Sequence, residues 1–147
     1  MHEQNKATGL DDFTRNYLYV LLGVALVGFV WWLSSLDFRV AEINRLLKAD
    51  AELAAYPYSF RVVSLHNGVA QMSSPRSAEL SAIQSLRVMY PQLKHRSAVS
   101  DEMVSAQKEL ARVQSYAGRL VKEQEGVNTV SWVLDKRWLE NHGVNVE

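Results

Sequence analysis

The chain has no cysteine among its 147 residues. This excludes disulfide bonds, thiolate metal ligands and a cysteine nucleophile. An excess of either charge is also missing, because sixteen Lys and Arg residues balance sixteen Asp and Glu residues. The pI is accordingly near neutral, about 6.9. A balanced chain of this kind gives no electrostatic reason to expect a nucleic-acid partner.

Motifs for catalysis and cofactor binding are lacking as well. No two histidines have the i, i+4 spacing that places two metal ligands on one helical face; they are His2, His66, His95 and His142. There is no glycine-rich phosphate-binding loop and no Gly-x-Ser-x-Gly elbow. We therefore expect no enzyme activity, no cofactor and no metal site. A hydrolase-type enzyme with a site assembled from distant residues is the third alternative for the function.

What the chain does have is one long apolar run near its N-terminus, after a short polar tail at 1–16. Residues 17–36 contain no charge, Pro, Asn or Gln. A helix of twenty residues covers roughly 30 Å, the hydrocarbon thickness of a bilayer. Aromatic residues stand near both ends, as in the aromatic belts of membrane helices; these predicted anchors are Tyr17, Tyr19, Trp31 and Trp32.

A cleavable signal peptide and a buried core helix also contain apolar runs, and both fit this one poorly. A signal peptide has a shorter apolar region followed by small residues, whereas this run ends in WWLSSLD. A core helix is rarely apolar on every face for five turns. The sequence therefore predicts a retained single span, which we assign to a bacterial inner membrane. The basic residues flanking it, two before and three after, do not decide which side the C-terminal part occupies.

A helical apolar stripe follows the span, within a juxtamembrane helix predicted over 37–55. Its members recur at spacings of four, three and four, and are Leu36, Val40, Ile43 and Leu47. Asp50 interrupts the stripe at the next expected position. Such a stripe packs either on its own domain or against another subunit, so self-association through these residues is one prediction.

The remaining residues, 56–147, predict an α+β domain. Alternation from Tyr58 to Val62, followed by Asn67-Gly68, is typical of a strand and a two-residue hairpin turn, with Val69 to Met72 returning antiparallel. Ser74-Pro75 predicts the start of a helix that ends at Pro91.

The second half of this domain predicts a long helix, a third strand and a short last helix. Ser100 is placed to cap the long helix, and Gly126 to end it. The core stripe of that helix steps by three and four, through Met103, Ala106, Leu110, Val113, Ala117 and Leu120. The strand at 127–134 turns Val130, Trp132 and Leu134 inward, and Asp135 caps a short helix that Gly143 closes. The expected architecture is a three-stranded sheet, a hairpin plus one strand, packed by two to three helices.

Two segments of this domain resemble the BON domain, a small αββαβ module of bacterial envelope proteins. The first is FRVVSLHNGVAQMSS, with Gly68 at the family's turn glycine. The second is AGRLVKEQEGVNTVSWVLD, with Gly126, Val127 and Val130 at the Gly-Val-x-x-Val pattern. The likeness covers roughly residues 58–135, and the juxtamembrane helix supplies the opening helix of the module.

The chain departs from the BON pattern at two places. Ser73 or Ser74 stands where the family has a second glycine, and an additional helix over about 75–90 separates the two matching segments. The resemblance implies a non-catalytic module that binds phospholipid surfaces or other envelope proteins, usually outside the cytoplasm.

These patterns together predict a membrane-anchored, non-enzymatic interaction module, an accessory or assembly subunit of a bacterial envelope complex. The candidate partner contacts are Trp132, on the uncovered face of the sheet, and the pair Arg137-Trp138, because aromatic and arginine side chains are favoured at interfaces. The alternative is a domain that binds phospholipid surfaces. Its candidate lipid contacts are the basic trio Lys94, His95 and Arg96.

Overall fold

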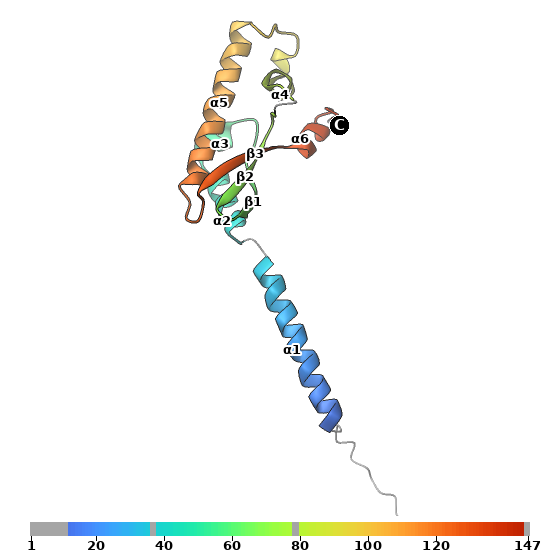
Figure 1. Ribbon diagram of the computed structural model, residues 1–147. Coiled ribbons are helices and arrows are strands. Elements are labelled where there is room, and N and C mark those ends of the chain that lie inside the picture. Colours follow the sequence, from blue (N-terminus) through green and yellow to red (C-terminus); the bar gives the residue numbers. More distant parts are fainter. Residues whose placement is uncertain (1–11, 36–37, 78–79, 146–147) are drawn as a thin grey trace, which may run out of the picture. The chain divides into compact units, whose positions relative to one another are not determined.

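The computed structural model describes residues 12–35, 38–77 and 80–145. The chain divides into two compact units, residues 1–36 and 37–147. The first contains the helix α1 (Asp12–Ser35), and the second contains all the other elements (Figure 1). Leu36, the first member of the predicted stripe, lies outside the described residues.

The helix α1 has 24 residues and is long and apolar enough to cross a membrane. Its length is about 36 Å at 1.5 Å per residue. No residue in the most apolar stretch of this helix is buried, so these side chains do not pack into a protein core among the described residues. Phe29 and Trp32 contact each other along it, with ring centroids 5.9 Å apart.

The second unit begins with two consecutive helices, α2 (Phe38–Ala49) and α3 (Ala51–Ala55), where one was predicted. Asp50 separates them, because its carboxylate accepts hydrogen bonds from the backbone N–H groups of Glu52 and Leu53 and so caps α3. Ile43 and Leu47 are 4% and 2% exposed and belong to the core of this unit. The stripe of α2 is therefore covered by its own domain.

The sheet has three strands in the order β1-β2-β3 and is mixed. The strands β1 (Val62–His66) and β2 (Val69–Ser74) form an antiparallel hairpin. Asn67 and Gly68 connect them with φ values of 50° and 77°, as the predicted type I′ turn requires. The third strand, β3 (Thr129–Leu134), runs parallel to β2 after a long helical connection. The α+β class with a three-stranded sheet is thus confirmed.

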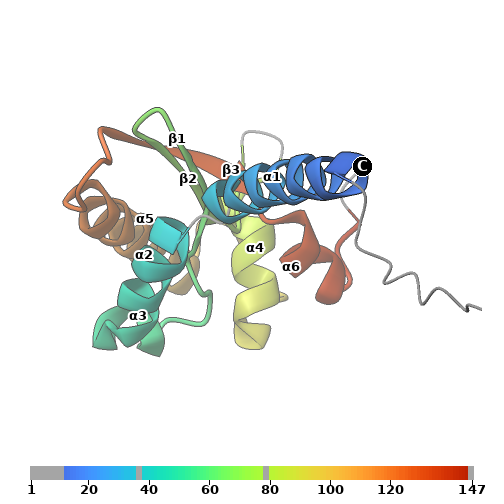
Figure 2. The same cartoon turned by 90° about the horizontal axis from the view of Figure 1, so that it is seen from below.

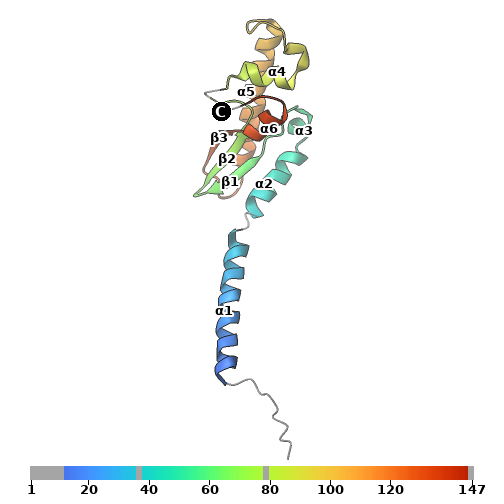
Figure 3. The same ribbon diagram turned by 90° about the vertical axis from the view of Figure 1, so that its right-hand side faces the viewer.

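One face of the sheet is packed by helices. Ala70 and Met72 of β2 are fully buried, and their neighbours in β3 are Val130 and Trp132. The long helix α5 (Asp101–Lys122) covers this face together with α2, as Figures 2 and 3 show. Gln71, between Ala70 and Met72 of β2, is on the opposite face and is exposed. Trp132 therefore lies on the helix-covered face, as the alternation of the strand predicts, and not on the uncovered face where its assignment as a partner contact placed it.

The helix α4 (Ala82–Met89) starts seven residues later than the Ser74-Pro75 pair predicts. Ser74 is the last residue of β2, where it pairs with Leu134 and its carbonyl accepts a hydrogen bond from the backbone N–H of Asp135. Strand pairing thus takes precedence over local capping, and Ser81 caps α4 instead. A 3₁₀ turn, η1 (Pro91–Leu93), follows this helix.

The long helix α5 begins as predicted, since the Ser100 hydroxyl accepts a hydrogen bond from the N–H of Met103. It ends at Lys122, earlier than the predicted Gly126, which has a φ of 78° in the turn leading to β3. The last helix, α6 (Lys136–Asn141), has the predicted cap Asp135, and Gly143 follows it with positive φ.

Candidate functional site

The four predicted membrane anchors are all exposed on α1. Their exposed fractions are 62% for Tyr17, 65% for Tyr19, 78% for Trp31 and 55% for Trp32. Fifteen residues separate Tyr17 from Trp32, which corresponds to about 22 Å along the helix axis. This spacing is suited to rings that lie near the two edges of an apolar layer.

The structure connects two of the predicted partner contacts through aromatic rings that the sequence did not single out as site residues. The Trp132 ring lies edge-on to Phe60 with centroids 6.1 Å apart, and Phe60 lies edge-on to Tyr58 at 4.9 Å. Tyr58 in turn contacts the Trp138 ring at 5.3 Å. Trp138 is only partly exposed, whereas Trp132 is 36% exposed and Arg137 is exposed. Trp132 and Arg137 are therefore the accessible members of the predicted set.

A buried carboxylate fixes the end of this aromatic chain. Asp135 is 5% exposed, and its Oδ2 accepts hydrogen bonds from the Tyr58 hydroxyl at 3.0 Å and from Arg61 Nη1 at 2.8 Å. Its Oδ1 accepts from Arg61 Nη2 and from the backbone N–H of Trp138, both at 3.2 Å. Burial, followed by the negative charge of Asp135, raises the pKa of the Tyr58 hydroxyl. These contacts position α6 and its tryptophan, so we interpret the cluster as structural.

A groove runs between α5 and the outer side of β3, which we call the β3 groove. Its volume is about 300 Å³, and it is lined by Ser115, Gly118, Arg119, Lys122, Thr129, Val130 and Trp132. Gly118 faces the indole ring, because a Cβ atom at this position would lie 3.2 Å from Trp132 Cζ2. The absent side chain therefore lets the ring pack closely against α5. None of the lining residues has a carboxylate, and two are cationic.

The predicted lipid contacts Lys94, His95 and Arg96 follow η1 and are exposed. Arg96 is already engaged, since its guanidinium lies 3.6 Å from Glu102 of α5 and its carbonyl accepts a hydrogen bond from Arg87. Among the described residues, Lys94 and His95 are therefore the two members of the trio that form no ion pair.

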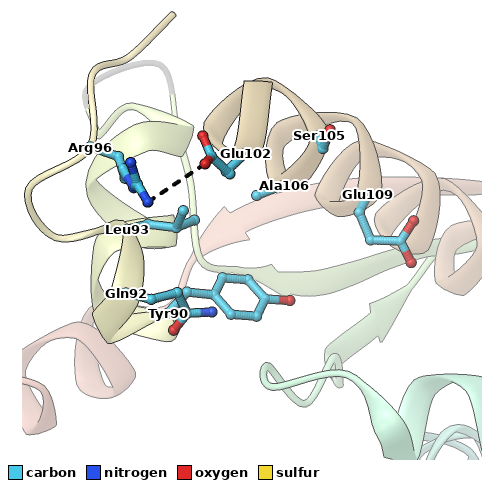
Figure 4. Close-up of a pocket in the computed structure, with 8 residues that line it drawn as sticks. All are labelled: Tyr90, Gln92, Leu93, Arg96, Glu102, Ser105, Ala106 and Glu109. Carbon is cyan, nitrogen blue, oxygen red and sulfur yellow. Dashed lines mark ion pairs between the residues drawn. The ribbon is translucent and has the colours of Figure 1, made fainter. Parts of the chain in front are cut away.

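Beside this basic trio lies a cavity of about 410 Å³, between η1 and the first half of α5 (Figure 4). Leu93 and Ala106 give it an apolar floor, and Tyr90 borders it. Glu102 and Glu109 stand on its α5 side. A hydrogen bond from Arg112 lowers the pKa of Glu109, which keeps that carboxylate charged. The negative charge of Glu109 therefore disfavours binding of an anionic group on this side of the cavity.

Within 12–35, 38–77 and 80–145, no three His, Asp or Glu side chains lie close enough together to hold a metal ion. Comparison with protein-family models, curated proteins and solved structures finds no match to this chain. The candidate site therefore depends on geometry alone. Sequence reasoning proposed Trp132 and Arg137, which the structure leaves accessible, but did not single out Arg61, Gly118 or Arg119, whose contacts are made across the fold.

Proposed function

We propose that the chain is a single-span protein of a bacterial inner membrane that acts, without catalysis, as an accessory or assembly subunit of an envelope complex. The observation that carries this proposal is α1, whose apolar side chains are exposed along its whole described length. Exposed apolar surface on this scale requires a cover, and a bilayer supplies one for a helix of this length.

The proposed function depends on confinement of the α+β domain to the membrane surface. A span holds the α+β domain at the membrane surface and so raises its effective concentration toward a partner in the same membrane. Trp132 and Arg137 are the side chains through which we expect contact, because both are accessible and belong to residue types that contribute strongly to interfaces. The BON-like resemblance, which we retain as part of the proposal, favours the periplasmic side for the domain.

A single introduced cysteine tests the topology, because the chain has no other thiol. Asn141→Cys is the better position, since Asn141 is exposed at the end of α6 whereas Asn67 occupies a turn position with a φ of 50°. A maleimide that cannot cross the inner membrane should label Asn141→Cys in intact cells, and the cysteine-free chain should stay unlabelled. Labelling only after lysis would contradict the periplasmic placement.

The anchor and the partner are tested by two further measurements. The chain should stay in the membrane fraction after an alkaline carbonate wash, and Val24→Arg should release part of it, because arginine at a helix centre costs about 3 kcal/mol of insertion free energy. Val24→Leu is the matched control. Mild detergent should extract the chain with a stoichiometric companion, and removal of the span should reduce this association. A chain that the carbonate wash releases, or that is extracted alone, contradicts the proposal.

The second candidate is a phospholipid-surface domain, supported by the exposed Lys94 and His95 beside an apolar cavity. The carboxylates of Glu102 and Glu109 on the same cavity weaken this candidate, since they repel phosphate groups. Binding to vesicles rich in anionic lipid, weakened by salt and by Lys94→Glu, would favour the lipid function. Equal behaviour of neutral and anionic vesicles would contradict it.

A further inference from the structure

The two edges of the sheet differ in how their backbone groups are covered. At the outer edge of β1, the Asn44 side chain of α2 donates to the carbonyl of Val62 at 2.8 Å and accepts from its N–H at 2.7 Å. At β3, the N–H of Thr129 bonds to Gly68 and that of Asp135 bonds to Ser74, so both point toward β2. Because successive residues of a strand alternate, those of Val130, Trp132 and Leu134 point away from the sheet.

This open edge borders the β3 groove. The helix α5 forms the opposite wall, where the absence of a side chain at Gly118 lets the Trp132 indole pack closely against the helix. A groove between an edge strand and a helix is suited to an extended chain, since backbone hydrogen bonds to the strand give affinity and alternate side chains enter the groove. The partly exposed indole provides an apolar contact for such a side chain.

The charges around the edge define the chemistry of the occupant. Arg119 and Lys122 line the groove near the start of β3, and Lys136 and Arg137 follow its last residue. All four are exposed, and none forms an ion pair with another residue in the described part of the chain. The carboxylate nearest to β3 in sequence is Asp135, which is 5% exposed and paired with Arg61. Glu123 and Glu125, in the turn before β3, are outside the groove lining.

We propose that the open edge of β3 binds an extended segment of a partner protein that carries acidic residues, adding it to the sheet as a fourth strand. This inference rests on the proposed interaction function and specifies the partner's chemistry. A second copy of the chain is a poorer occupant. Antiparallel pairing of two β3 strands would bring Lys136 and Arg137 of one copy to Arg119 and Lys122 of the other, and parallel pairing would also align like charges.

The test measures fluorescence anisotropy of short labelled peptides with the full chain in neutral detergent. One peptide alternates glutamate and valine, a second alternates lysine and valine, and a third is the acidic peptide with alternate amides N-methylated to block strand pairing. We expect the acidic peptide to bind at least about tenfold more tightly than the other two, with an affinity that falls as salt rises.

Charge reversal at the groove gives the matched variants. The double variant Arg119→Glu/Lys122→Glu should weaken binding of the acidic peptide about tenfold, since each reversal converts an attraction into a repulsion. Lys108→Glu makes the same kind of change at an exposed position on α5 outside the groove lining and should leave binding unchanged. Circular dichroism verifies that each variant is folded.

Three results would overturn the inference. Equal binding of the N-methylated peptide would mean that charge alone attracts it, and absence of binding would mean that the edge does not accept a strand. A dimer of the chain that Val130→Pro dissociates would identify a second copy as the occupant. If the acidic peptide does not bind but a stoichiometric membrane companion is still extracted, strand addition at β3 is refuted and the proposed function stands. If both fail, the proposed function fails too.

Discussion

The replacement of Asp135 by alanine gives the most direct test of how the domain holds its last helix. The carboxylate accepts four hydrogen bonds, from the Tyr58 hydroxyl, from both terminal nitrogens of Arg61 and from the backbone of Trp138. These donors come from the segment before β1 and from α6. Removing the carboxylate therefore breaks the polar attachment of α6, which still packs through Trp138 and Leu139. It also leaves the Tyr58 hydroxyl buried without this acceptor.

The expected loss of stability can be worked out from these contacts. An unsatisfied buried hydroxyl costs about 1–3 kcal/mol, and the lost helix cap costs about 1 kcal/mol. The ion pair adds at most about 1 kcal/mol, because the Arg61 side chain is 47% exposed and water screens it. Since neighbouring contributions are not additive, we expect about 3 kcal/mol in total, which corresponds to roughly 10–15 °C in Tm for a domain of this size.

Thermal unfolding of the full chain in neutral detergent, followed by circular dichroism, measures this loss. Asp135→Asn should lose less than Asp135→Ala, because asparagine still caps a helix and still accepts from Tyr58. The double variant Tyr58→Phe/Asp135→Ala should be more stable than the sum of the single changes predicts, since the two groups bond to each other. A loss below about 1 kcal/mol for Asp135→Ala, or strict additivity with Tyr58→Phe, would refute this role of the cluster.

Three further predictions concern the turn, the sheet edge and the pH dependence. Gly68→Ala should lower the free energy of unfolding by about 1–3 kcal/mol, because φ is 77° and the new Cβ would clash with the Asn128 side chain. Gly143→Ala, with the same φ and open space around it, is the control and should lose only about 1 kcal/mol in a urea titration. Asn44→Asp should cost about 1–2 kcal/mol, since a carboxylate cannot donate to the β1 carbonyl; unchanged urea midpoints would contradict this role. The pKa of Tyr58 is raised in the folded state. The contribution of its hydroxyl to the free energy of unfolding is therefore complete below pH 10, near the ordinary tyrosine pKa, and is lost as the pH rises above that value. Tyr58→Phe should therefore show a smaller fall in Tm between pH 9 and 11, and an equal fall would contradict the assignment.

Local chemistry was sufficient to predict the turns and caps of this domain. Asn67-Gly68 adopts the positive φ values of its turn, and Ser100 and Asp135 cap the helices that they were expected to cap. Each of these features depends on residues within four positions of one another. The prediction that Ser74 caps a helix was wrong for the complementary reason. Ser74 pairs in the sheet with Leu134, which is distant in sequence, so local patterns do not indicate this pairing.

The candidate site was harder to predict because its contacts are long-range. Arg61 and Asp135 are separated by 74 positions, and no periodicity within either segment indicates that they meet. The alternation of β3 correctly turned Trp132 inward but carried no information on how far α5 extends over it. The close packing of Trp132 on Gly118 depends on that helix position, so the β3 groove becomes visible only in the folded chain.

Cationic side chains beside an open strand, such as Arg119 and Lys122, can also protect that edge from aggregation. Variants of these two residues distinguish this protective role from recognition of an acidic strand. Lysine and arginine at such an edge discourage aggregation, because like charges oppose edge-to-edge pairing of two copies. Because antiparallel pairing would bring positions 119 and 122 of one copy to Lys136 and Arg137 of the other, a purely protective role predicts that both double variants aggregate. Arg119→Glu/Lys122→Glu should then aggregate more strongly than neutral Arg119→Gln/Lys122→Gln, since it turns the repulsion into an attraction. Recognition of an acidic strand predicts instead that both double variants lose the peptide, and the reversed one more strongly. Light scattering together with peptide anisotropy on the two variants distinguishes these roles. Aggregation of both variants, stronger for the reversed one, with no peptide bound by the unmodified chain, would assign Arg119 and Lys122 to protection of the edge.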